Sequence, residues 1–232
     1  MSGLVLVVFA VLAGGMIYYG WVQEKKRLEA LSRLAAELGF VFEPDKDTTR
    51  RGGRYDQIDL LTKGSNRFTQ NHLVGQVEGR QVIACDFHDE TYSNNHKGHR
   101  QTHHHYFGIV FIEIPLRMSQ VCIRGENILD KLAGALGFED IDFESAEFSR
   151  RFHVSAKERK FAYDLIHPRA MEYLLDHDSY SWEFDGTVIA LYQSSRFKPE
   201  AIQSAIQTAI GFIPLIPEYV LAERSRPNAT EK

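Results

Sequence analysis

The first strong pattern along the chain is a run of twenty residues, 3–22, that contains no charged side chain. At about 1.5 Å of rise per residue, a helix of this length reaches roughly 30 Å, the thickness of the hydrocarbon core of a bilayer. Tyr18, Tyr19 and Trp21 lie near the end of the run, and such amphipathic rings favour the membrane interface. The pattern predicts a transmembrane helix that holds the chain in the lipid bilayer.

A cleaved signal peptide is the rival interpretation of the same run. It requires basic residues before a shorter apolar core, whereas here the positive charges of Lys25, Lys26 and Arg27 come afterwards. Cationic flanking segments stay on the cytoplasmic side of a membrane. We therefore expect an uncleaved, single-pass protein of the cell (inner) membrane, with its short N-terminus outside and the remaining domain in the cytoplasm.

Helical spacing of apolar residues recurs after the membrane segment. It predicts a helix over 24–38 that continues from the span, and a second amphipathic helix over 126–136. A third helix is expected over 158–177, with a break or a new first turn at Pro168. The last helix should begin at Pro199, because proline suits the first helical turn.

Strand patterns separate these helices. The apolar runs 71–77 and 80–87 flank Glu78 and Gly79, which suit a tight hairpin turn. The run 105–114 is apolar on both faces, which is typical of a strand in a sheet that is covered on two sides.

Two further strand segments are expected in the second half of the chain. One covers 147–156, and the other is a hairpin over 181–193. The turn of that hairpin is predicted at Asp185 and Gly186.

Short echoes along the sequence raise the hypothesis of an internal duplication. LAAELGF at 34–40 returns as LAGALGF at 132–138, and EGRQVIA at 78–84 resembles DGTVIAL at 185–191. Two half-domains, each with a helix first and a sheet after it, explain both echoes. A general preference for helix-glycine-strand junctions explains them equally.

Together these elements predict an α+β fold: antiparallel sheets flanked by helices, after an N-terminal transmembrane helix. The expected divisions are a membrane anchor at 1–23, a juxtamembrane helix at 24–39, a first α+β half at 40–125, a second half at 126–221 and a disordered tail at 222–232.

The segment 145–200 resembles a family of uncharacterised bacterial membrane-associated domains, a domain of unknown function. The resemblance rests on an E-F-x-x-x-F-x-V segment, an A-x-x-L-x-P-x-x-M-x-x-L helix, an F-D-G hairpin and a closing F-x-P-E. The matching residues are Glu147, Phe148, Phe152, Val154, Ala162, Leu165, Pro168, Met171, Leu174, Phe184, Asp185, Gly186, Phe197, Pro199 and Glu200. These are packing and turn positions, so the resemblance implies location and fold and no activity.

Composition and motifs narrow the function classes. The formal net charge of −4 argues against a general nucleic-acid binder, which carries a basic surface. Cys85 and Cys122 lie in apolar, strand-like runs and fit buried reduced thiols of a cytoplasmic domain. The sequence contains no nucleophile elbow, phosphate-binding glycine loop, dinucleotide fingerprint or HExxH helix. This favours a binding module over an enzyme.

The segment 88–107 holds the densest group of metal-ligand residue types, with six of the ten histidines. On an alternating strand His88 and Glu90 share one face. If the next strand returns antiparallel, one register sets His88 opposite His105 and Glu90 opposite His103, close enough to hold a zinc ion together. A slip of one residue exchanges both partners for His104. The other interpretations are a pH-sensitive loop and a solvated hairpin tip, to which His96 and His99 would belong.

Two hypotheses of function follow. The first is a membrane-tethered binding or scaffold module that recruits a protein partner. The alternative is a metal-dependent enzyme, or a metal or pH sensor, that uses the histidine-rich hairpin 88–105 with His88, Glu90, His103 and His105 as ligands.

Overall fold

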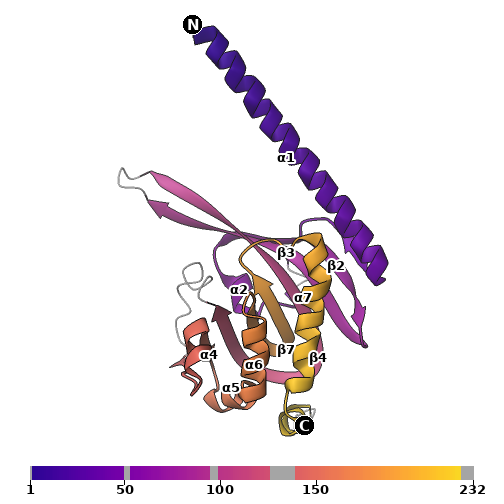
Figure 1. Cartoon of the computed structure of the whole chain (residues 1–232), viewed down its shortest axis with the longest axis vertical. Coiled ribbons are helices and arrows are strands. Elements are labelled where there is room, and N and C mark those ends of the chain that lie inside the picture. Colours follow the sequence, from indigo (N-terminus) through magenta and orange to yellow (C-terminus); the bar gives the residue numbers. More distant parts are fainter. Residues whose placement is uncertain (1, 50–52, 95–98, 126–138, 226–232) are drawn as a thin grey trace.

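The long N-terminal helix is the most prominent element of the computed structural model, which describes residues 2–49, 53–94, 99–125 and 139–225. Helix α1 (Ser2–Leu38) is continuous, and its N-terminal part extends away from the domain (Figure 1). Its side chains from residue 7 to residue 21 are all exposed, and it contains a segment long and apolar enough to span a bilayer. Gly39 ends it with a φ of 69°, so the predicted helix beyond the apolar run is confirmed.

One antiparallel sheet forms the centre of the domain, which confirms the predicted α+β class. The strand order among the described residues is β1-β2-β3-β4-β6-β5, and β7 pairs with β4 as well. The strands are β1 (Val41–Glu43), β2 (Ser65–Val77), β3 (Arg80–Asn94), β4 (Arg100–Gly125), β5 (Glu139–Asp140), β6 (Phe152–Ala156) and β7 (Ser181–Gln193).

Strand β4 is the element that joins the two predicted halves. Its first part pairs with β3, and its last part pairs with β6. Strand β7, from the second half, pairs with β4 from Gly108 to Ile123. Both halves therefore contribute to one sheet, while the division into two duplicated units stays a prediction.

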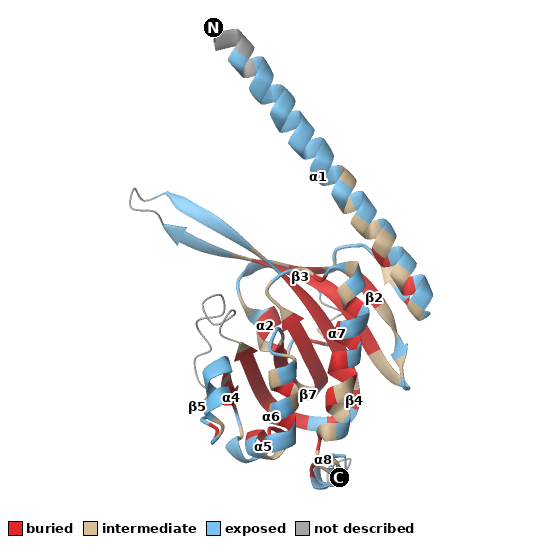
Figure 2. Cartoon of the chain, in the orientation of Figure 1, coloured by how far each residue is buried: buried red, intermediate tan, exposed pale blue. Residues whose placement is uncertain are grey.

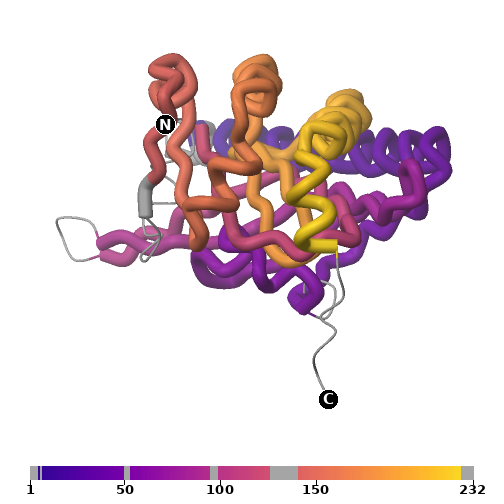
Figure 3. Tube along the Cα trace, turned by 90° about the horizontal axis from the view of Figure 1, so that it is seen from below, coloured from indigo at the N-terminus to yellow at the C-terminus, as the bar shows by residue number. Residues whose placement is uncertain are grey.

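Helices cover both faces of this sheet. The larger core lies between one face and the C-terminal part of α1, together with α4 to α8, and the smaller core lies under α2 on the other face. Figure 3 shows the three layers edge-on, and Figure 2 shows that the strands between them are buried. The helices are α2 (Asp59–Thr62), α4 (Ala146–Arg151), α5 (Arg159–Leu165), α6 (Pro168–Asp176), α7 (Pro199–Phe212) and α8 (Glu218–Arg224), with a 3-10 turn η1 (Ile213–Leu215).

The two predicted hairpin turns have different outcomes. Glu78 and Gly79 form the expected turn between β2 and β3, with positive φ angles of 51° and 75°. Asp185 and Gly186 do not form a turn, because they lie inside the single strand β7. The echo between 78–84 and 185–191 therefore matches a turn with the interior of a strand and supports no repeat.

Other predictions also need correction. The segment 147–156 is half helical, because Ser145 caps α4 by accepting a hydrogen bond from the backbone N–H of Phe148, and β6 begins only at Phe152. The tail predicted from residue 222 is helical up to Arg224, the end of α8. The predicted helix 126–136 lies outside the described residues.

Candidate functional site

The outer parts of β3 and β4 form a two-stranded arm that extends beyond the sheet (Figure 1), here called the hairpin arm and comprising residues 88–94 and 100–106. The arm and the free part of α1 extend from the same end of the domain. The observed register sets His88 opposite Tyr106 and Glu90 opposite His104. The expected pairing of His88 with His105 and of Glu90 with His103 was therefore wrong by one residue.

Packing on the α2 side of the sheet explains this register. Phe87 lies opposite Phe107 with ring centroids 6.1 Å apart, and Cys85 lies opposite Ile109; all four are buried in the smaller core. The expected register would have removed these apolar pairs. Matching the aromatic residues of the two strands was the signal in the sequence that could have found it.

The register separates the histidines between two faces of the arm. His103 lies opposite Thr91, and its Nε2 is 2.8 Å from Oγ of Ser93. His105 lies opposite Asp89, and its Nε2 is 2.9 Å from Oγ1 of Thr91. Neither joins His88 and Glu90. Whether any of the predicted residues binds a metal stays a prediction.

His104 takes the place that was predicted for the other two histidines. Its Nδ1 lies 3.2 Å from Nε2 of His88 and 3.4 Å from Oε1 of Glu90. The three ligand-type atoms all lie within 4.8 Å of one another. His88 is buried, Glu90 is half-buried, and the His104 side chain is 53% exposed.

Asn66 of β2 holds two of these side chains from the neighbouring strand. Its backbone carbonyl lies 3.2 Å from Nδ1 of His88, and its side-chain amide donates to Oε1 of Glu90 at 2.7 Å. The hydroxyl of Tyr92 donates to the other carboxylate oxygen at 3.0 Å. The hydrogen bond from Asn66 lowers the pKa of Glu90, so the carboxylate is ionised near neutral pH.

The junction between α1 and the sheet lies next to this cluster. Arg27 donates from Nη2 to Oδ1 of Asp86 at 2.9 Å and to the carbonyl of Phe197 at 3.0 Å. Asn71 donates to the other oxygen of Asp86 at 2.9 Å. Burial raises the pKa of Asp86 in spite of the Arg27 guanidinium beside it. Sequence reasoning missed this contact, because 59 residues separate its partners.

A second junction contact ties α1 to the segment after β7. Arg196 donates from Nη1 to both carboxylate oxygens of Glu24 at 3.1 Å. Its guanidinium also lies 5.8 Å from the ring centroid of Tyr106, which in turn contacts the His88 ring at 4.8 Å. The base of α1 and the root of the arm are therefore packed against common neighbours.

A buried polar cluster lies on the opposite face, under α2. Glu183 of β7 is fully buried and accepts hydrogen bonds from the backbone N–H of Asp59 and from Gln120. Arg124 donates to Oδ2 of Asp59 at 2.6 Å. Burial raises the pKa of Glu183 to about 7. Glu183 thus caps the first turn of α2 from another element, a structural role that its place in an apolar strand did not indicate.

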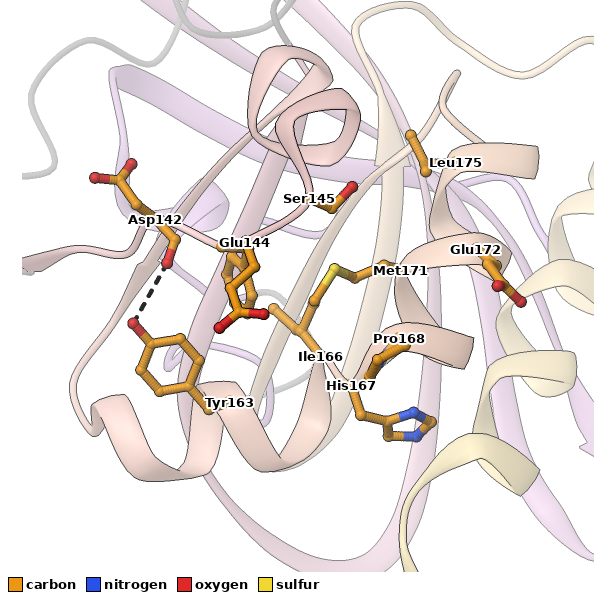
Figure 4. A pocket seen from close by; sticks show the side chains of 11 residues that line it. Asp142, Glu144, Ser145, Tyr163, Ile166, His167, Pro168, Met171, Glu172 and Leu175 are labelled. Atoms are coloured by element: carbon orange, nitrogen blue, oxygen red, sulfur yellow. Dashed lines mark hydrogen bonds between the residues drawn. The ribbon is translucent and has the colours of Figure 1, made fainter.

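An apolar groove of about 580 Å³ lies between the segment before α4 and helices α5 and α6. Ile166 and Met171 lie at its centre, and the carboxylates of Asp142, Glu144 and Glu172 lie around it (Figure 4). Helices α5 and α6 lie at the end of the domain away from the N-terminus of α1 (Figure 1).

The fold is similar to that of the mycobacterial trehalose monomycolate transport factor A, TtfA, in its crystal structure. The similarity covers 88% of this chain and 98% of that chain, with a TM-score of 0.59 and 12% sequence identity. No family model and no curated protein matches the sequence, so the resemblance over 145–200 stays an expectation. At this level of identity the similarity concerns the fold alone.

Proposed function

We propose that this protein is a single-pass, membrane-anchored accessory factor that binds a protein partner and performs no catalysis, in a transport process of the kind named for TtfA. The observation that carries the proposal is the continuity of α1. Its exposed apolar part runs without a break into turns where Leu31 and Ala35 are buried in the domain. A bilayer that holds the first part therefore holds the domain at its surface.

The orientation follows from the charges at the end of the apolar run. Lys25, Lys26 and Arg27 precede the first buried turn of α1, so the domain belongs on the cytoplasmic side. We expect green fluorescent protein fused after Lys232 to fluoresce, and a periplasmic phosphatase fused at the same place to be inactive. The chain should resist extraction by alkaline carbonate. An active phosphatase, or a mature chain that lacks the first 22 residues, would contradict the proposal.

The groove at α5 and α6 is the surface that we assign to the partner. Its apolar centre and the surrounding carboxylates fit an apolar peptide segment flanked by basic residues. The groove lies at the end of the domain away from the N-terminus of α1, where a membrane would not cover it.

Site-specific photo-crosslinking in intact membranes tests this assignment. A photoreactive residue at Leu175, in the groove, should trap one protein through an apolar segment with basic flanks, identified by mass spectrometry. The same residue at exposed Val41, in β1, is the matched control and should not trap it. Met171→Glu should abolish the crosslink. An identical yield from both positions, or an unchanged crosslink in M171E, would overturn the assignment.

A further inference from the structure

The root of the hairpin arm brings together three side chains with the geometry of a metal site. A tetrahedral zinc ion with ligands at 2.0–2.2 Å separates its donor atoms by about 3.3–3.6 Å. The distances of 3.2 Å from Nε2 of His88 to Nδ1 of His104 and 3.4 Å from Nδ1 of His104 to Oε1 of Glu90 are close to these edges. The donor atoms of His88 and Glu90 lie within 4.8 Å of each other, so the side chains must close this edge by up to about 1.5 Å to seat an ion among all three donors.

Hydrogen bonding fixes His88 in the ring form that a metal requires. The backbone carbonyl of Asn66 only accepts, so Nδ1 of His88 carries the ring proton in the contact between them. In the neutral ring Nε2 is then the acceptor in the hydrogen bond with Nδ1 of His104, and a metal ion would take the place of the proton between them. A ligating histidine that donates its second ring N–H to a backbone carbonyl is the usual outer-sphere arrangement of metal sites.

Asn66 also positions the carboxylate, and its backbone conformation supports a dedicated role. Its φ of 48° lies in the left-handed region, next to a register irregularity between β2 and β3. From this position one residue orients Glu90 with its side chain and His88 with its carbonyl. The ring of Phe68 stacks on His88 at 4.6 Å and restricts it further.

The cluster is open to solvent on the side of His104. This side chain lines a hollow of about 290 Å³ together with Tyr106, Ser195 and Arg196. His104 is therefore the donor that an ion reaches from solvent. Three protein ligands leave the fourth position for water, as in open zinc sites.

We propose that His88, Glu90 and His104 bind one divalent transition-metal ion of the zinc type. The bound ion joins β3 to β4 at the root of the hairpin arm and, through Asn66, fixes both to β2. Asp86, the partner of Arg27, lies two residues before His88 on the same face of β3. The ion thus stabilises the arm beside the junction that holds α1.

Metal titration of the full chain in detergent, purified without a histidine tag and freed of metal with a chelator, tests the proposal. We expect one equivalent of Co²⁺ with the visible absorption of a tetrahedral site, displaced by one equivalent of Zn²⁺. The melting temperature should rise with Zn²⁺ concentration, because the ion binds the folded chain.

Variants locate the site. His104→Ala changes an exposed side chain and should leave the fold intact, yet weaken Zn²⁺ binding at least tenfold. His103→Ala with His105→Ala is the matched control from the same strand and should bind Zn²⁺ as the parent does. Asn66→Gly keeps the left-handed backbone and the carbonyl but removes the amide, and should weaken binding by roughly tenfold, as loss of an outer-sphere partner does.

Several outcomes would overturn the site. One is less than about 0.1 equivalent of Co²⁺ or Zn²⁺ on the parent chain. Equal Zn²⁺ affinity in H104A and the parent would also exclude the site. Binding that disappears only when His103 and His105 are both replaced would exclude it as well, because the ion would then lie on the opposite face of the arm.

Discussion

Arg27 and Asp86 form a buried ion pair between the helix that leaves the domain and the central sheet. The side chains are 14% and 5% exposed, and Nη2 of Arg27 lies 2.9 Å from Oδ1 of Asp86. The guanidinium also donates to the carbonyl of Phe197, and Asn71 donates to the carboxylate, so four segments meet at this pair. Because these charges are shielded from water, their pairing matters more than that of ion pairs on the surface.

Asp86→Ala should destabilise the protein strongly. It leaves the Arg27 guanidinium buried without its carboxylate, a change that costs about 3–5 kcal/mol in comparable buried pairs. Denaturant unfolding of the full chain in detergent, at neutral pH, measures the loss. The control is Asp178→Ala, which removes the exposed partner of Arg151 and should cost about 1 kcal/mol or less. Equal losses in the two variants would contradict the role given to the Arg27–Asp86 pair.

Gly108→Ala, in strand β4, should also destabilise the junction between α1 and the sheet. Gly108 lies opposite Asp86 in the sheet, and its N–H donates to the carbonyl of Ser195 at 2.8 Å. A Cβ atom there would lie 2.6 Å from the backbone nitrogen of Phe197, too close without a shift of that segment. We expect a loss of about 1–3 kcal/mol in denaturant unfolding. Gly125→Ala, in the same strand, meets only a carbonyl oxygen at 3.6 Å and should be tolerated.

The raised pKa of Glu183 predicts how the stability of the protein depends on pH. Its pKa of about 7 in the folded protein lies above the ordinary value of 4.5, because burial penalises the charged form. The protonated form is therefore favoured by folding. Its contribution is fully present below about pH 4.5 and is lost as the pH rises from there to about 7, with a slope of at most about 1.4 kcal/mol per pH unit that levels off above the folded pKa.

Unfolding free energies at pH 5.5, 6.0, 6.5, 7.0 and 8.0 test this dependence. The parent chain should lose stability across the series, and Glu183→Gln should flatten the curve whatever its effect at a single pH. Glu147→Gln, at an exposed position of α4, should keep the parent's slope. A parent curve that rises over this range, or the same slope in E183Q, would exclude Glu183 as the titrating group.

Local patterns predicted the elements whose signals lie within one segment. The apolar run and the leucine spacing predicted α1, and Pro168 and Pro199 were correctly placed at helix starts. That β7 is one continuous strand was not predictable in this way. Asp185 and Gly186 carry a turn signal, but the residues before and after them both pair with β4, and this pairing outweighs the signal. Long-range pairing here overrides local turn propensity.

The candidate metal site shows the same limit. Alternation placed His88 and Glu90 on one face, as observed. The choice among the three consecutive histidines depended on register, which the Phe87–Phe107 pair decides from the smaller core. Asn66, which orients His88 and Glu90, lies in another strand, at an irregular stretch of backbone. No spacing in the sequence indicates this role.

Gly186 allows the balance between local preference and pairing to be measured. It has a φ of 55° inside β7, and a Cβ atom there would meet nothing closer than the Gln57 amide at 3.8 Å. Replacement therefore tests backbone conformation without a steric clash. We expect Gly186→Ala to cost about 1–2 kcal/mol in denaturant unfolding, the penalty of a left-handed residue with a Cβ atom. Gly186→Asn should cost less, because asparagine tolerates this conformation. Equal costs for G186A and G186N would mean that the left-handed backbone preference does not decide the effect.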